Sequence, residues 1–138
     1  AARAAKAEAV RRDRSLLTRY PNEASHLRAR ESTLDSGRKL VASSEARLKA
    51  LQEERKPLLA DAEFYAGKPV PPKLKAQLDA NEVSSEGQRS QIEAQKAEMA
   101  RVNQRYDEEL HRLKKLWAGS PPGSFELQAA VAGSAPAK

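Results

Sequence analysis

Two sets of apolar residues repeat every seventh position, running in opposite directions along the chain. The first set is Leu27, Leu34, Val41 and Leu48. The second set, read backward, is Leu113, Tyr106, Met99 and Ile92. Taken in order, their members pair symmetrically about Val70, which lies in the proline- and glycine-rich run 67–72. Because heptad stripes pair helices and such a run breaks them, the pattern predicts an all-α, coiled-coil-like antiparallel helical hairpin.

The composition favours slender helices over a thick core. The chain has 138 residues, of which 32% are charged and only 4% are aromatic, a balance typical of long helices. No cysteine is present, which excludes disulfides and thiolate metal sites. No apolar run approaches the roughly 18–20 residues of a membrane span, so at most a peripheral membrane contact is expected.

Three segments are expected along the chain. Residues 1–20 should form a short basic helix that ends at Pro21, and Asn22 should cap the next helix. Residues 22–118 should form the hairpin, with its turn at 67–72 and a kink near Glu53-Glu54 caused by Pro57. Residues 119–138 are rich in Gly, Ser, Pro and Ala and should form a disordered tail.

The mirrored register predicts the pairs Leu27–Leu113, Leu34–Tyr106, Val41–Met99 and Leu48–Ile92. It also places Arg55 opposite Ser85, in a weakly packed region beside Pro57. The half of the hairpin nearest the chain ends should therefore carry most of its stability. A rival interpretation is an open helix that pairs with a second chain.

The titratable residues do not form a catalytic pattern. His26 and His111 should lie about one turn apart near Asp107, but no HxxxH or ExxH spacing supports a metal site. We expect two partly exposed histidines, no metal and no cofactor. The carboxylates have basic neighbours three or four residues away, as on a solvated helix face. The sequence therefore predicts a protein that is not an enzyme.

Positive charge is concentrated in the first helix, where residues 1–19 hold six bases and two acids. The anion-binding candidates are Arg11, Arg12, Arg14 and Arg19. Such a patch suits nucleic acid, anionic lipid or a polyanionic envelope polymer, although a soluble helix end has the same composition. No aromatic side chain lies among these arginines to stack on bases, which argues against nucleic acid.

Apolar residues gather where the chain ends should meet. The candidates for an interaction surface are Leu16, Leu17, Tyr20, Leu110, Leu113 and Trp117. They form either a small core beneath a folded-back first helix or a surface for a second copy or another protein. Folding back should leave part of the stripe of Leu110, Leu113 and Trp117 exposed. We therefore expect a dimer or higher assembly.

Three segments, residues 12–21, 62–65 and 101–109, resemble the helical region of uncharacterised proteobacterial envelope proteins. The resemblance spans about residues 8–118. Members of that group typically carry a secretion signal, sometimes a small N-terminal domain, and then a long charged helical region. The resemblance implies a periplasmic or cell-envelope location and supplies no catalytic residues. A chain that begins without Met is consistent with removal of such a signal.

Together these observations favour a structural or protein-interaction role in the bacterial cell envelope, as a spacer or docking rod. The alternative is an anion-binding module that uses the arginine cluster of the first helix. Steep salt dependence of binding would favour the alternative, and salt-insensitive binding of a protein partner would favour the first role.

Overall fold

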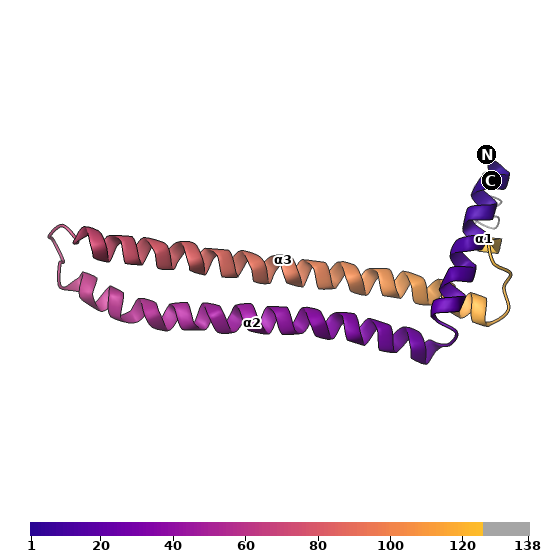
Figure 1. The fold of residues 1–138 in the computed structure, drawn as a ribbon, viewed down its shortest axis with the longest axis horizontal. Helices are drawn as coiled ribbons and strands as arrows, with labels where there is room; N and C mark the ends of the chain where they lie inside the picture. The colour runs from indigo at the N-terminus through magenta and orange to yellow at the C-terminus, as the bar shows by residue number, and fades with distance from the viewer. Residues whose placement is uncertain (126–138) are drawn as a thin grey trace, which may run out of the picture. The chain divides into compact units, whose positions relative to one another are not determined.

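Three long helices account for most of the described residues, 1–125, in the computed structural model (Figure 1). They are α1 (Ala2–Arg19), α2 (Glu23–Glu63) and α3 (Pro72–Trp117). The all-α class and the helical hairpin preceded by a short basic helix are thereby confirmed. The chain divides into two compact units, unit 1 (residues 1–32 and from 103 onward) and unit 2 (residues 33–102).

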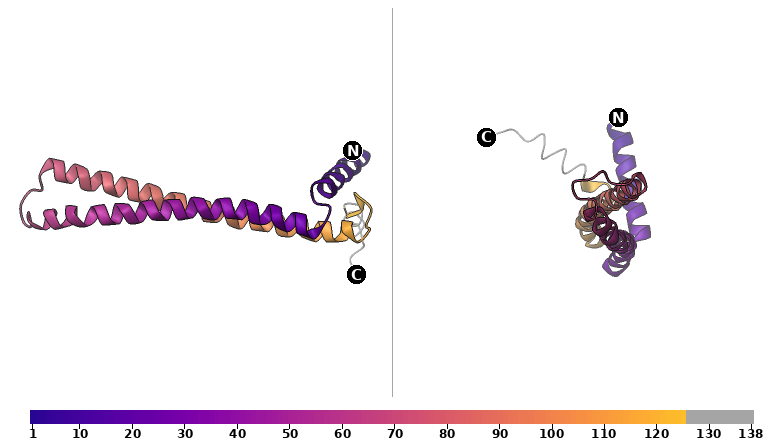
Figure 2. Two further views of the ribbon diagram at one scale, coloured as in Figure 1. Left: turned by 60° about the horizontal axis from the view of Figure 1, so that its bottom comes forward. Right: turned by 90° about the vertical axis from the view of Figure 1, so that its left-hand side faces the viewer.

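Unit 2 is a pair of antiparallel helices that lie next to each other in Figure 1, and in the left view of Figure 2 α3 passes behind α2. Within it, buried and half-buried residues follow one another at alternating spacings of four and three, as in a heptad. On α2 they include Leu34, Gly37, Val41, Ser44, Leu48, Leu51, Arg55, Leu58 and Ala62. On α3 they include Leu74, Leu78, Asn81, Ser85, Gln88, Ile92, Gln95, Met99 and Val102.

Polar residues in this stripe are hydrogen-bonded across the two helices. Asn81 is 4% exposed, and its Nδ2 donates to the backbone carbonyl of Leu51 at 2.8 Å. Arg55 donates from one guanidinium nitrogen to Asn81 Oδ1 at 3.2 Å and to the carbonyl of Leu78 at 3.3 Å. Because a buried amide is costly only when unpaired, these contacts let a polar layer sit inside the hairpin.

The observed register differs from the predicted one by about one helical turn. Met99 lies against Gly37, where an added Cβ would be 2.8 Å from Met99 Cγ, whereas the mirror rule paired Met99 with Val41. Arg55 likewise contacts Asn81, whereas the mirror rule placed it opposite Ser85. Both observed pairs are symmetric about Lys68 instead of Val70. The predicted register is therefore wrong.

The error arose because the prediction aligned only the large apolar residues. In the structure small and polar residues, such as Gly37 and Asn81, occupy the same stripe as the large apolar ones. The predicted pair Leu27–Leu113 shows the consequence most clearly. Leu27 is 56% exposed, while Leu113 is fully buried in the core of unit 1.

The turn between the two helices lies where the helix-breaking run predicted it. Helix α2 continues through Pro57 and ends at Glu63, a few residues before the turn predicted at 67–72. Turns stabilised by backbone hydrogen bonds follow over residues 64–68. Gly67 adopts a φ of 75°, a conformation that glycine adopts without strain, and Pro72 begins α3.

In unit 1, helix α1 folds back onto the end of α3 instead of extending away from it. Tyr20 ends α1, and Asn22 caps α2 by accepting a hydrogen bond on Oδ1 from the Ser25 backbone nitrogen at 2.9 Å. Figure 1 shows α1 crossing the end of α3 steeply. A small core forms at the crossing from Leu16, Leu113 and Leu116, with Leu17, Tyr20, Trp117 and Phe125 packed around it.

The first residues of the segment that we expected to be a disordered tail, 119–125, contact the helices of unit 1, and disorder of the tail stays a prediction. Gly119, at a φ of 109°, ends the helix, and the Ser120 nitrogen donates to the Lys115 carbonyl at 3.0 Å. Residues 120–125 then pass close to α1, where Gly123 lies against Val10. Residues 126–138 of the predicted tail lie outside the described residues.

Among the described residues, no helix combines the length and the apolar character needed to cross a membrane.

Replacing Gly37 by Leu should lower the free energy of unfolding by about 1–3 kcal/mol, because the new side chain would collide with Met99. The matched control is Gly87→Leu on α3, where an added Cβ meets nothing within 4 Å. That change should stabilise the protein slightly through helix propensity. Urea denaturation followed by circular dichroism measures both, and equal stabilisation by the two variants would contradict the observed register.

Candidate functional sites

The most buried charge in unit 1 is Asp13, whose side chain is 0% exposed. Arg112 of α3 holds its carboxylate from two nitrogens, Nε to Oδ1 and a terminal nitrogen to Oδ2, the latter at 3.2 Å. The backbone nitrogen of Gly123 also donates to Oδ2, at 2.7 Å. One carboxylate therefore joins α1, α3 and the segment that follows α3.

Sequence reasoning did not select Asp13, although the chain contains a signal for it. Ala9, Asp13, Leu16 and Tyr20 are spaced by four, three and four residues, so they share one face of α1. An acid within an otherwise apolar stripe indicates a buried ion pair, because an unpaired buried carboxylate is very costly.

His26 occupies a second buried polar position in unit 1. It is 1% exposed, which corrects the expectation of two partly exposed histidines, whereas His111 is exposed. Its Nε2 lies 3.1 Å from Glu109 Oε1. The centroid of its ring lies 4.8 Å from that of Tyr20 and 5.1 Å from that of Tyr106, both in edge-to-face geometry. Among residues 1–125, no three His, Asp or Glu side chains converge in a way that would hold a metal ion.

Tyr20 links this aromatic contact to the end of α3. Its backbone carbonyl accepts a hydrogen bond from Trp117 Nε1 at 2.9 Å. Burial raises the pKa of the Tyr20 phenol above its ordinary value, and the neighbouring Glu109 carboxylate adds to the effect. The Tyr20 ring contacts His26 and so joins the end of α1 to the first turns of α2.

The residues predicted as an interaction surface form a core within one chain. Leu113 is fully buried and Leu16 is 8% exposed, while Leu17, Tyr20, Leu110 and Trp117 are half-buried. We expected folding back to leave part of the stripe of Leu110, Leu113 and Trp117 exposed, and of these Leu113 is fully buried while Leu110 and Trp117 are half-buried. Assembly into a dimer or a higher oligomer stays a prediction.

The four predicted anion-binding arginines fall on two sides of α1. Arg12 and Arg19 are seven residues apart and both line a groove between α1 and α3. Arg11 is exposed and forms an ion pair with Glu8, whose carboxyl pKa it lowers by a hydrogen bond and by its charge. Arg14 is exposed and does not line that groove. The cluster predicted from sequence is therefore split into two pairs.

Two adjoining grooves lie between α1, α3 and the segment after α3. The first has a volume of about 340 Å³ and is lined by Arg12, Ser15, Leu16, Arg19, Glu109 and Arg112. The second has a volume of about 400 Å³ and is lined by Leu16, Arg105, Glu108, Glu109, His111, Arg112, Lys115 and Phe125. The Phe125 ring lies 5.0 Å from the Arg112 guanidinium carbon and 5.3 Å from Lys115 Nζ. Both grooves are lined by cationic side chains, by Leu16 and by Glu109, and the second groove also by Glu108.

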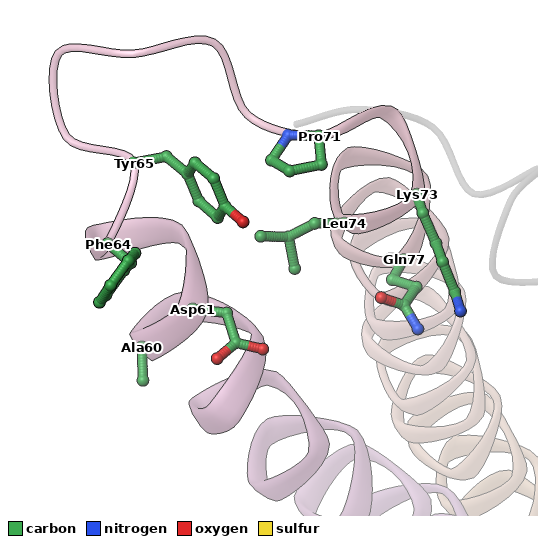
Figure 3. Close-up of a pocket in the computed structure, with 8 residues that line it drawn as sticks. All are labelled: Ala60, Asp61, Phe64, Tyr65, Pro71, Lys73, Leu74 and Gln77. Atoms are coloured by element: carbon green, nitrogen blue, oxygen red, sulfur yellow. The ribbon is translucent and has the colours of Figure 1, made fainter.

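A cleft of about 520 Å³ opens in unit 2 between the end of α2 and the start of α3. Figure 3 shows Tyr65 directed across it toward Leu74, with Asp61 on the α2 side and Lys73 and Gln77 on the α3 side. Phe64 lies at its edge and is 87% exposed, the highest value among the large exposed apolar residues described. The cleft combines a deep leucine, two aromatic rings and one side chain of each charge.

Comparisons of this chain with protein-family models, with curated proteins and with solved structures found no match.

Replacing Asp13 by Ala should lower the free energy of unfolding by about 2–3 kcal/mol, because Arg112 and the Gly123 nitrogen would lose their partner. The matched control is Glu8→Ala on the same helix, whose ion pair is exposed and should contribute little to the free energy of unfolding. Fluorescence of Trp117, the single tryptophan, reports unfolding of unit 1 in urea. Equal small effects of both substitutions would show that the buried pair is not a source of stability.

Proposed function

We propose that this chain is a non-enzymatic protein of the bacterial cell envelope that acts as a spacer or docking rod. The observation that carries the proposal is the heptad stripe of unit 2, which pairs residues 34–62 with residues 74–102 inside a single chain. At about 1.5 Å per residue, that stretch of α2 is on the order of 43 Å long.

The chemistry of the stripe supports a structural role for the hairpin. Its polar members are used in contacts between the two helices, as in the layer formed by Arg55 and Asn81. The envelope location rests on the resemblance of residues 8–118 to proteobacterial envelope proteins.

Docking is proposed at the cleft beside the hairpin turn. Exposed apolar residues elsewhere in unit 2, such as Leu40 and Val83, are isolated and need no special explanation. Phe64 differs from them because it adjoins a cleft that also contains Tyr65 and Leu74. An aromatic anchor beside a cleft is typical of protein–protein contacts, and we propose another envelope protein as the partner.

A photo-reactive amino acid in place of Phe64 should form a discrete adduct with one envelope protein in the producing bacterium. The matched control is the same amino acid at Val83, which is 73% exposed in the same unit but does not line the cleft. Mass spectrometry identifies the partner, and Phe64→Ser should weaken its binding to the purified chain about tenfold or more.

Two results would contradict this proposal. One is the same set of adducts at positions 64 and 83, which would indicate random collisions. The other is an adduct with cytoplasmic proteins alone, which would exclude the envelope location.

A further inference from the structure

The ion pair between Asp13 and Arg112 changes the charge that α1 presents to solvent. Helix α1 carries six basic residues and two acidic ones, Glu8 and Asp13. Because Asp13 is fully buried against Arg112, Glu8 is the one acid that α1 exposes. The solvent-facing surface of this helix is therefore more basic than the sequence alone suggests.

Part of this positive charge converges on one place. The groove of about 340 Å³ is lined by Arg12 and Arg19 of α1 and by Arg112 of α3. Ser15 and the buried Leu16 line it as well. The one carboxylate that lines this groove, Glu109, is hydrogen-bonded to His26, and the Arg112 guanidinium is held by Asp13. Three arginines and one carboxylate thus line a single groove.

We propose that this groove binds a phosphate group, either on a soluble phosphate compound or on a phospholipid headgroup. Guanidinium groups present planar pairs of N–H donors that match phosphate oxygens, and several such donors around one anion favour phosphate over a simple halide. A serine hydroxyl supplies one further donor of the kind that phosphate accepts. The volume of the groove lies within the range of small-molecule sites.

The adjoining groove extends the site toward an organic substituent. It shares Leu16, Glu109 and Arg112 with the first groove and is bounded by the aromatic ring of Phe125. A phosphate bound in the first groove would therefore have Leu16 and Phe125 beside it, together with charged side chains of α3 that include Glu108 and Lys115. A phosphate ester fits this arrangement better than inorganic phosphate alone.

The test compares two double variants that remove the same charge from the same helix. Arg12→Gln with Arg19→Gln removes the two groove arginines of α1, and Arg11→Gln with Arg14→Gln removes two arginines that do not line the groove. Titration calorimetry with inorganic phosphate and with glycerol phosphate, at constant ionic strength, measures binding to each protein. Circular dichroism confirms that both variants remain helical.

The groove variant should lose about tenfold or more in affinity for both phosphate compounds, because each guanidinium makes charge-assisted hydrogen bonds. The control variant should change the affinity less than about threefold, since only long-range attraction is lost. Equal losses in the two variants, or no phosphate binding by the unaltered chain, would overturn the proposal.

The same proteins distinguish the two sources of phosphate. Vesicles of phosphatidylglycerol with phosphatidylcholine are tested against vesicles of phosphatidylcholine alone, with glycerol phosphate as a competitor. Binding that depends on Arg12 and Arg19 and is reversed by glycerol phosphate identifies a headgroup. Binding of glycerol phosphate without vesicle binding identifies a soluble ester. Failure of this proposal leaves the proposed docking role intact, because the cleft at Phe64 lies in unit 2.

Discussion

The alternating spacing of three and four between buried residues is the constraint on which unit 2 depends. Only Leu34, Leu51, Leu74 and Val102 are buried apolar members of that stripe, and many other members are small or polar. Two helices held by so narrow a seam gain little from apolar burial alone. Interdigitation, as where Met99 fills the space beside Gly37, and the polar layer at Arg55 and Asn81 must therefore fix how they align.

In unit 1, a small core holds together three chain segments: α1, the end of α3 and the segment that follows α3. Leu16, Leu113 and Leu116 supply the apolar part, and the Asp13 carboxylate supplies directed hydrogen bonds to Arg112 and Gly123. Directed bonds fix the angle and position at which segments meet, which apolar contact alone does not. The same pairing removes one acid from the surface of α1 and so links the fold of this unit to its charge.

The helices and their ends were predictable because local signals determine them. Pro21 and Asn22 mark the break between α1 and α2, and Gly119 marks the end of α3. The register of the hairpin was not predictable from apolar residues alone. Gly37 and Asn81 belong to the buried stripe as well, and each contacts the opposite helix.

Of the candidate sites, the arginines were found from charge, but their division between two faces depends on where α1 crosses α3. Asp13 was missed because its partner lies 99 residues away.

Disulfide trapping tests the register of α2 against α3 directly, because the chain contains no cysteine of its own. Gly37→Cys with Met99→Cys places two thiols at the observed contact, within the separation that a disulfide spans. The comparison is Val41→Cys with Met99→Cys, the pair that apolar symmetry favours. We expect rapid intramolecular oxidation of the first pair and slow oxidation of the second. Thiol counting and gel mobility under mild oxidant measure both rates. Faster closure of the Val41 pair, or disulfides formed only between chains, would contradict the observed register.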